Sequence, residues 1–355
     1  MAELILDLND AGIRVAQPGS DRLLELEGGS PESPGYALIT RKQLVTGRDA
    51  YHQALIQPLD VQHRFWDQLG IEPAAAGYNQ AELACAHLQH IWSQTGTGVD
   101  RVWATVPAIY DTDQLGILYE ICRELRLPLE SLVAAPVLVQ GAFSRAVHLD
   151  LGLHRCVFSL LEQGERIDLV HAQSYPNMGW LSLSRQWVKS IANEFVRTTR
   201  FDPLYQATSE QGLHARIEPL LRSLQAHDST ALEVSGHRIT LMRTMMSEWV
   251  HSLLTGMTSA LQVSLREQGW DHVDHIFLSD RLGLIPGVLR LIKQQVGGTV
   301  EALSSSPALA LAQTEARDLF AAPVDGQVTY QTARASGSWN VVSPAALPPP
   351  LPPVS

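Results

Sequence analysis

The chain has 355 residues, of which 45% are hydrophobic and 18% are charged, and this length allows two domains that each have a core. Its formal net charge of −11 produces a negative field that repels nucleic acid and anionic membrane surfaces. No apolar run approaches the ~18 residues that span a bilayer, and no signal-peptide pattern opens the chain. We therefore expect a cytoplasmic protein that neither binds nucleic acid nor inserts into a membrane.

The first half begins with a predicted β-meander and continues with alternating helices and strands. Alternating or continuous apolar residues place the strands of the meander at 4–8, 13–16 and 36–39. Apolar residues at helical spacing predict helices over 83–92 and 113–126, with a buried strand over 100–107 between them. The segment 131–143 reads as a short strand that enters another helix.

The second half repeats this plan, which indicates two duplicated lobes. Three more strands are expected at 147–151, 156–161 and 166–172. The elements expected after them are helices at 183–198 and 209–225, a strand pair at 230–234 and 237–240, a helix at 242–268, a strand at 276–279 and a helix at 286–296. We predict an α/β protein whose lobes span residues 1–146 and 147–335 and flank a central cleft.

The last segment, 336–355, is predicted to be a disordered tail. Five of its last eight residues are proline, which removes backbone donors and favours a polyproline II conformation that does not pack on the core. Such a segment can dock on an aromatic groove of a protein partner or remain a solvated tail, and both interpretations stay open.

Cysteine and histidine residues give no pattern of a metal or redox site. Cys85, Cys122 and Cys156 have apolar neighbours and no C-x-x-C spacing, so we expect buried, reduced thiols. One close histidine pair lies in the segment 271–275, which we interpret as a hydrated turn.

Two turns share one design: an apolar strand ends in Asp and enters a turn. The first is the segment 6–12, which contains Asp7, and the second is 149–155, which contains Asp150. One such turn in each half predicts that the two lobes face one site.

The order of several motifs resembles the superfamily of actin, sugar kinases and 70-kDa heat-shock chaperones. The segment 103–110, W-A-T-V-P-A-I-Y, is similar to the chaperone pattern V-x-T-V-P-A-Y/F. Asp150-Leu151-Gly152 lies where the chaperones carry D-L-G-G-G-T, and the segment 279–288 resembles their adenosine turn, G-G-S-x-R-I-P-x-V. The resemblance covers roughly residues 1 to 325 and implies two RNase H-like, actin-like ATPase lobes.

The resemblance also implies a nucleotide cleft. Members of this superfamily hold ATP or ADP with Mg²⁺ between the lobes, and an Asp at each strand end orients the hydrated ion. By position these carboxylates are Asp7 and Asp150. The other residues assigned by position to the cleft are Asn9, Gly152, Arg155 and Ser279.

The motifs depart from the family where phosphate contact is closest. Asn9 replaces a glycine of the first turn, and Asp10 places a carboxylate where phosphate oxygens should lie. Leu153 and His154 replace glycines of the second turn, and Arg155 could compensate with a positive charge.

Two catalytic positions also differ from the family. By position in the resemblance, Trp66 lies where the chaperones carry their catalytic Lys, and Ala135 lies where they carry the Glu that polarises water. These changes favour a non-hydrolysing scaffold or assembly partner that has kept the architecture. The alternative is a divergent ATP-binding protein or slow ATPase that acts as a nucleotide-gated switch.

Overall fold

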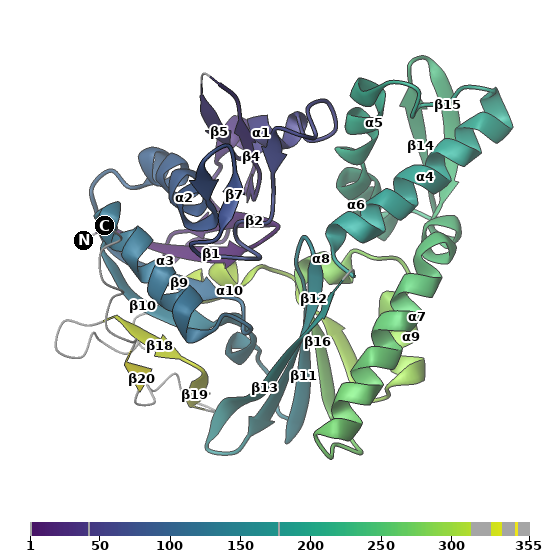
Figure 1. Ribbon diagram of the computed structural model, residues 1–355. Helices are drawn as coiled ribbons and strands as arrows, with labels where there is room; N and C mark the ends of the chain where they lie inside the picture. The colour runs from purple at the N-terminus through teal and green to yellow at the C-terminus, as the bar shows by residue number, and fades with distance from the viewer. Residues whose placement is uncertain (1, 42, 177, 314–327, 336–344, 347–355) are drawn as a thin grey trace.

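The computed structural model describes residues 2–41, 43–176, 178–313, 328–335 and 345–346. Two large mixed sheets form the centres of two lobes (Figure 1). In the first sheet the strands follow the order β20-β18-β10-β9-β1-β2-β3, and in the second the order is β17-β16-β11-β12-β13-β19. The strands of the first sheet are β1 Ala2–Asn9, β2 Gly12–Ala16, β3 Ser33–Pro34, β9 Val99–Val106, β10 Leu129–Ala134, β18 Thr329–Gln331 and β20 Ala345–Ala346. Those of the second are β11 Arg145–Leu151, β12 Arg155–Gln163, β13 Arg166–Pro176, β16 His275–Leu278, β17 Thr299–Ala302 and β19 Ala333–Ala335.

The two sheets share a five-strand pattern. In the first, β1 is antiparallel to β2 and parallel to β9, and in the second, β11 is antiparallel to β12 and parallel to β16. The outer neighbours β3 and β13 continue the antiparallel side, while β10 and β17 continue the parallel side. The predicted mixed α/β architecture is therefore confirmed, and the two halves of the chain repeat one strand order.

Helices and three small sheets complete the lobes. The helices are α1 Arg48–His52, α2 Gln80–Thr95, α3 Thr112–Glu124, α4 Trp180–Thr199, α5 Ala207–His214, α6 Ile217–Ala226, α7 Arg243–Glu267, α8 Asp280–Gly283, α9 Val288–Gln295 and α10 Pro307–Ala312, with the 3-10 turns η1 Glu27–Gly29 and η2 Ala135–Leu138. The strands of the small sheets are β4 Ala37–Ile39 with β5 Leu44–Thr46 and β6 Val61–Gln62, β7 Pro73–Ala75 with β8 Tyr78–Asn79, and β14 Ser229–Val234 with β15 His237–Met242.

Alternation along β1 decides which side chains face the other lobe. Leu4, Leu6 and Leu8 belong to the core of the first lobe, under α2 and α3. Ile5 points the other way and joins a cluster that also contains Phe277 of β16 in the second lobe. Asp7 shares the face of Ile5, so the strand period places its carboxyl group on the side that faces the second lobe.

Several boundaries differ from the sequence predictions. The third strand of the first meander is the two-residue β3, and the predicted strand at 36–39 is β4 of a separate small sheet. The segment 131–143 contains η2 in place of an α-helix, and the predicted helix at 209–225 is divided into α5 and α6. These segments are short, so contacts with the rest of the protein decide their conformation.

After α9 the described chain contributes to both large sheets, since β18 belongs to the first and β19 pairs with β13 of the second. The helix α10 packs on β1 and β2, and β18 pairs with β10. Ala345–Ala346 pair with β18, so the predicted absence of packing after residue 336 does not hold for these two residues. The remainder of the predicted tail, 336–344 and 347–355, lies outside the described residues.

Within the described ranges, no helix is both long and apolar enough to cross a bilayer. The three cysteines are free; Cys122 and Cys156 are buried as expected, whereas Cys85 is only half-buried. Within the same ranges, no group of three or more His, Cys, Asp or Glu side chains is arranged to hold a metal ion.

Candidate functional site

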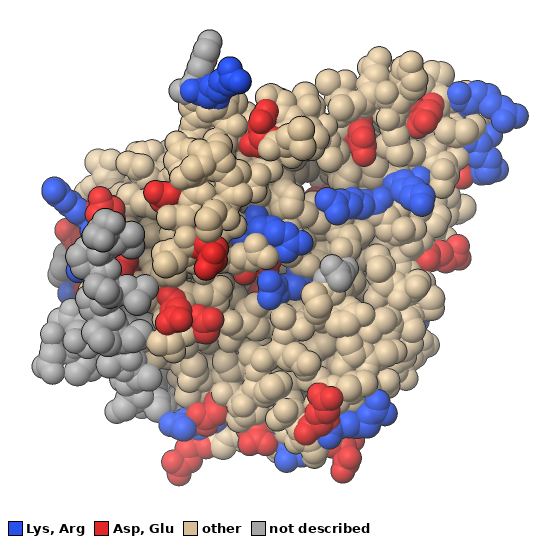
Figure 2. Space-filling model, viewed as in Figure 1, with Lys and Arg blue, Asp and Glu red and all other residues tan. Residues whose placement is uncertain are grey.

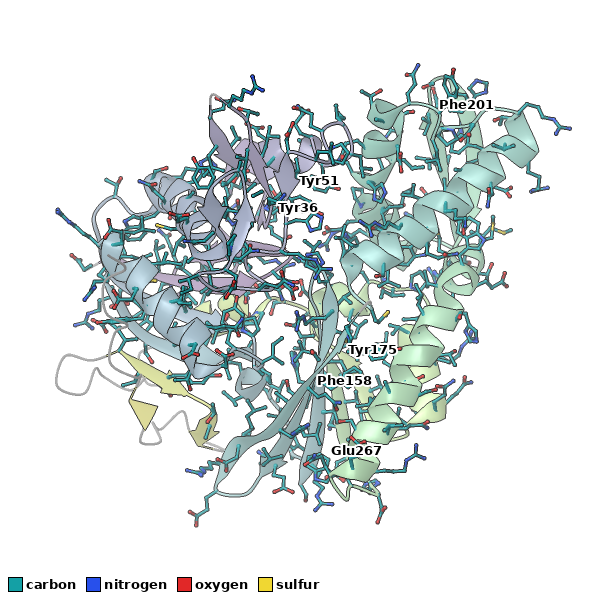
Figure 3. All side chains as sticks on the ribbon, viewed as in Figure 1. Tyr36, Tyr51, Phe158, Tyr175, Phe201 and Glu267 are labelled. Carbon is teal, nitrogen blue, oxygen red and sulfur yellow. The ribbon has the colours of Figure 1, made fainter. Side chains whose placement is uncertain are left out.

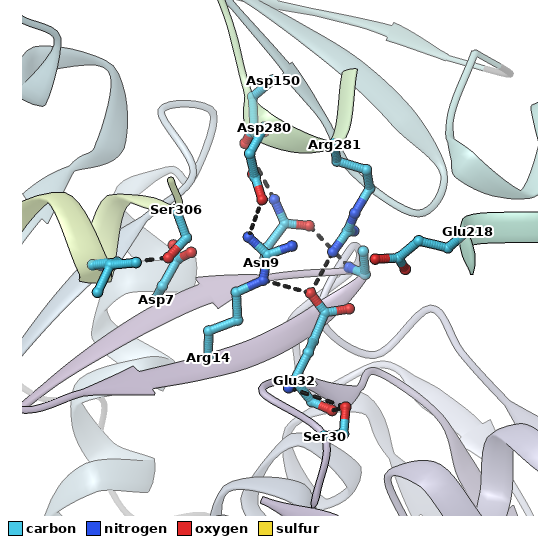
Figure 4. Close-up of polar contacts among 12 residues, drawn as sticks. Asp7, Asn9, Arg14, Ser30, Glu32, Asp150, Glu218, Asp280, Arg281 and Ser306 are labelled. Carbon is cyan, nitrogen blue, oxygen red and sulfur yellow. Dashed lines mark hydrogen bonds and ion pairs between the residues drawn. The ribbon is translucent and has the colours of Figure 1, made fainter. Parts of the chain in front are cut away.

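The two Asp-containing turns meet where the lobes face each other (Figure 4). The first turn connects β1 to β2, and the second connects β11 to β12. Asn9 Nδ2, at the end of β1, donates a hydrogen bond of 3.2 Å to Asp150 Oδ2 near the end of β11. Asn9 Oδ1 accepts from the Ala11 N–H at 2.9 Å, which fixes the side chain within its own turn. The sequence prediction that these turns face one site agrees with this contact.

The carboxylate of Asp10 binds the backbone of the second turn. Its Oδ1 accepts from the Leu153 N–H at 2.7 Å, and its Oδ2 accepts from the His154 N–H at 3.1 Å. Burial raises the pKa of Asp10 to about 6, although both N–H donors lower it. At pH 7 the group is mostly ionised, so both hydrogen bonds are charge-assisted. Asp10 therefore forms a direct polar link between the lobes.

The absence of a side chain at Gly152 leaves room for the Asp10 carboxylate. A Cβ atom at residue 152 would lie 2.2 Å from Asp10 Oδ1 and 3.3 Å from the Arg155 carbonyl oxygen. Only a glycine lets the Asp10 carboxylate approach the second turn this closely. In this structure the retained glycine thus accommodates an internal carboxylate.

Asp7 lies on β1, two residues before Asn9, and is almost fully buried. Its Oδ1 accepts from the Thr105 hydroxyl at 2.7 Å. Burial raises the pKa of Asp7 to about 7, against the opposing effects of Arg14 and Thr105. Asp7 and Asp150 line the same small cavity, together with Asn9 and Ser279. The structure therefore brings the two predicted magnesium-orienting carboxylates together.

A four-residue ion cluster joins the lobes beside Asp7 (Figure 4). Arg14 donates from Nε to Glu32 at 2.7 Å and from Nη1 to Asp280 at 2.8 Å, and Arg281 donates to the same Glu32 oxygen at 2.5 Å. Burial alone would raise the pKa of Glu32, but the two guanidinium groups lower it below its ordinary value. Each lobe thus contributes one guanidinium group and one carboxylate, so the cluster that joins the lobes has no net charge.

Arg155 and Ser279 each have a partner within the protein. Arg155 Nη2 pairs with Asp67 Oδ1 of the first lobe at 2.5 Å, and Arg64 pairs with the other Asp67 oxygen at 3.1 Å. Ser279 Oγ accepts from the Leu151 N–H at 3.1 Å and so supports the second turn from beneath. The guanidinium group of Arg155, which the sequence suggested as a contact for phosphate, therefore pairs with the Asp67 carboxylate.

Ring contacts extend the interface above the turns. His154 Nε2 donates to the His63 carbonyl at 2.8 Å, and the two imidazole rings stack with their centroids 5.0 Å apart. Tyr36 packs on His63 and on Tyr51, with centroid distances of 5.5 and 5.1 Å (Figure 3). Burial, together with the neighbouring His154, lowers the pKa of His63 to about 4. Both lobes contribute rings that are neutral at pH 7.

Little space remains between the turns. The cavity shared by Asp7, Asn9 and Asp150 has a volume of about 20 Å³, and an adjacent cavity that Gly152 and Arg155 line is equally small. Each holds about one water molecule, whereas pockets for drug-sized ligands span roughly 300–1,000 Å³. The space-filling view shows side chains closing most of the gap seen in the ribbon (Figure 2). In this arrangement the residues do not fit a nucleotide.

The positions aligned with catalytic residues have structural roles. Trp66 is buried in the first core, and its indole N–H donates to His87 Nδ1 at 2.9 Å. Burial lowers the pKa of His87 to about 3, so this ring is a neutral acceptor. Ala135 begins η2 and offers no proton acceptor on its side chain.

Sequence reasoning missed the ion cluster and misjudged Asp10. The sequence places Arg14 between the apolar residues Ile13 and Val15 of a buried strand, a pattern that signals a paired buried charge. For Asp10 we expected repulsion, because the pattern did not reveal that N–H groups of the other lobe face it. Comparison with protein-family models and with curated protein sequences finds no match for this chain.

Proposed function

We propose that this protein is a non-hydrolysing relative of the actin and 70-kDa heat-shock superfamily that serves as a scaffold or assembly partner for another protein. Two features support RNase H-like lobes of that kind. The same five-strand order occurs in both sheets, and the turn after the first strand of each sheet lies at the interface between them.

The observation that carries the proposal is the position of the Asp10 carboxylate. In the superfamily, backbone N–H groups of the second turn bind phosphate oxygens. Here the N–H groups of Leu153 and His154 bind Asp10 at 2.7 and 3.1 Å. An internal carboxylate thus takes the contacts that a nucleotide would need, and a phosphate group would first have to displace it.

The remaining contacts favour a fixed relation between the lobes over a cycle of opening. The Arg14 cluster, the Arg155–Asp67 pair and the stacked histidines all cross the interface. At the tips of the lobes, the Leu55 N–H donates to Gln211 Oε1 at 3.0 Å. A body held at this many points presents a constant surface, which is what an assembly partner needs.

Titration calorimetry with MgATP and a phosphate-release assay test the proposal. We expect no binding in the micromolar range and no phosphate release above the buffer control. Micromolar binding with turnover that Asp7→Ala or Asp150→Ala abolishes would rule the proposal out.

A divergent ATP-binding protein or slow switch is the second candidate. It is favoured by one observation: Asp7, Asn9, Asp150 and Ser279 line a single cavity between the lobes. The same titration separates the candidates, since the switch requires MgATP to bind with or without turnover. The identity of the protein partner, and docking through the proline-rich tail, remain predictions.

A further inference from the structure

A larger cavity lies at the edge of the interface, away from the Asp10 contact. It has a volume of about 470 Å³ and is formed by η2, the segment after β17 and α10. It shares His148 with the small cavity beside Asp7. Its volume lies within the range of ligand pockets, so a small molecule fits here where a nucleotide does not fit between the turns.

The polar groups that line this cavity include a carboxylate, amides and hydroxyl groups, and all of them can accept hydrogen bonds. Glu301 contributes a carboxylate, and its side chain is 57% exposed, so solvent ligands can reach it. Gln140 and Gln313 contribute amide oxygens, and Ser304 and Ser305 contribute hydroxyl groups. Leu138, Val139 and Leu303 supply apolar wall.

His148 is the buried member of this set. Its side chain lines the cavity, the residue is 2% exposed, and its Nδ1 has no hydrogen-bond partner among the described residues. Burial lowers the pKa of His148 more than Asp150 and Asp280 raise it, so the ring is neutral at pH 7. A neutral imidazole has one unprotonated nitrogen that accepts a hydrogen bond. A buried polar atom without a partner is costly, so a donor from a ligand would stabilise this ring.

The charge of the lining selects the ligand class. Within the described part of the chain, the lining contains no Lys or Arg, and Glu301 is its only carboxylate. The N-terminus of α10 adds little positive potential, because Ser306 accepts from the N–H groups of Leu309 and Ala310. These features disfavour phosphates and carboxylates and favour a cation.

The lining also distinguishes among cations. A quaternary ammonium ion is recognised by the faces of Trp, Tyr and Phe, and none of these residues belongs to the described lining. A primary ammonium group donates three hydrogen bonds and suits carboxylate, amide, hydroxyl and imidazole acceptors. We propose that this cavity binds a small aliphatic primary amine, with Glu301 and His148 as the main acceptors for its ammonium group.

Three four-carbon probes of matched shape test this proposal by calorimetry at physiological ionic strength, which screens unspecific attraction. They are 1,4-diaminobutane, 1,4-butanediol and succinate. We expect the diamine to bind with one-to-one stoichiometry and the diol and the dianion to bind at least about tenfold more weakly. Equal binding of the diol, tighter binding of succinate, or no heat with the diamine would overturn the assignment.

A matched pair of variants locates the site. Glu301→Gln should weaken diamine binding by about tenfold, whereas Glu165→Gln, which removes the same charge from an exposed turn, should change it by less than about twofold. Equal losses in the two variants would mean attraction to the acidic surface as a whole and would contradict the proposal.

In the wild-type protein, the ¹⁵N resonances of His148 should shift on addition of diamine and not on addition of diol. Unchanged His148 resonances at saturation would also contradict it.

Discussion

At the scale of single residues, the Asp10 carboxylate is the feature on which the interface between the turns depends. Asp10→Ala leaves the N–H groups of Leu153 and His154 without their acceptor. A buried donor that loses its partner costs about 1–3 kcal/mol, so we expect the free energy of unfolding to fall by about that amount. Denaturant unfolding measures it, with Asp21→Ala at an exposed position as the control. Equal stability of the two variants would contradict a structural role for Asp10.

Gly152 offers a sharper test of the same contact. Gly152→Ala alone should destabilise the protein, because its Cβ would lie 2.2 Å from Asp10 Oδ1. In the background of Asp10→Ala the clash is removed, so the cost of Gly152→Ala should drop by about 1 kcal/mol or more in a double-mutant cycle. Additive effects of the two substitutions would show that the close approach is not what restricts residue 152.

The sequence located these residues but not their interactions. Asp7, Asn9, Asp150, Gly152, Arg155 and Ser279 were predicted to share one site, and they line two adjacent small cavities. Which atoms pair could not be predicted, because the partners lie far apart in the sequence, as in Asn9 with Asp150. A turn pattern in the sequence predicts local conformation, but it does not show which side chain of the other lobe lies opposite the turn.

At the scale of elements, helix α2 supports the first lobe beneath Trp66. It begins with a capping box in which Asn79 Oδ1 accepts from the Glu82 N–H and Glu82 accepts from the Asn79 N–H. Asn79→Ala should lower the free energy of unfolding by about 1 kcal/mol, whereas Asn79→Asp, which keeps the acceptor, should cost much less. Thermal unfolding of the two variants distinguishes these outcomes, and an equal loss would argue against capping as the cause.

Elements with long apolar patterns were predicted well, and short ones were not. The strands β11, β12 and β13 lie where they were predicted, because each contains a run rich in apolar residues. The strand β3 consists of Ser33 and Pro34, which carry no strand signal, and its pairing with β2 is imposed by the surrounding structure. The helix expected at 286–296 starts at Val288, after Gly287 with a φ of 83°, and a separate short helix, α8, precedes it.

At the scale of the whole molecule, the histidines at the interface make its stability depend on pH. The pKa of His63 is about 4 in the folded protein and ordinarily 6.5, so between these values the unfolded chain binds more protons. The stability that neutral His63 provides is fully present above pH 6.5 and is lost as the pH falls to about 4. The slope is at most about 1.4 kcal/mol per pH unit for one proton.

His63→Gln removes this titration. The stability of the wild type relative to His63→Gln should therefore decline as the pH is lowered from 6.5 to 4 and stay constant between 7 and 8. Urea unfolding of both proteins across this range measures the difference. A difference that does not change with pH would mean that His63 is not buried against His154 in solution.

The repeated order of strands and helices in the sequence predicts a duplicated plan, and five strands of each large sheet follow the same order. The return of the chain to the first lobe was not predicted. The strand β18 pairs with β10, which lies about two hundred residues earlier in the sequence. The three residues of β18 have no sequence pattern from which this partner could be predicted.

The central claim, that Asp10 holds the second turn in place of a phosphate, is tested most directly by amide hydrogen exchange at Leu153 and His154. We predict that both N–H groups are protected in the nucleotide-free protein, lose protection in Asp10→Ala and keep the wild-type rates when MgATP is added. Rapid exchange of both amides in the free wild-type protein, with protection that appears only on addition of MgATP, would contradict the account.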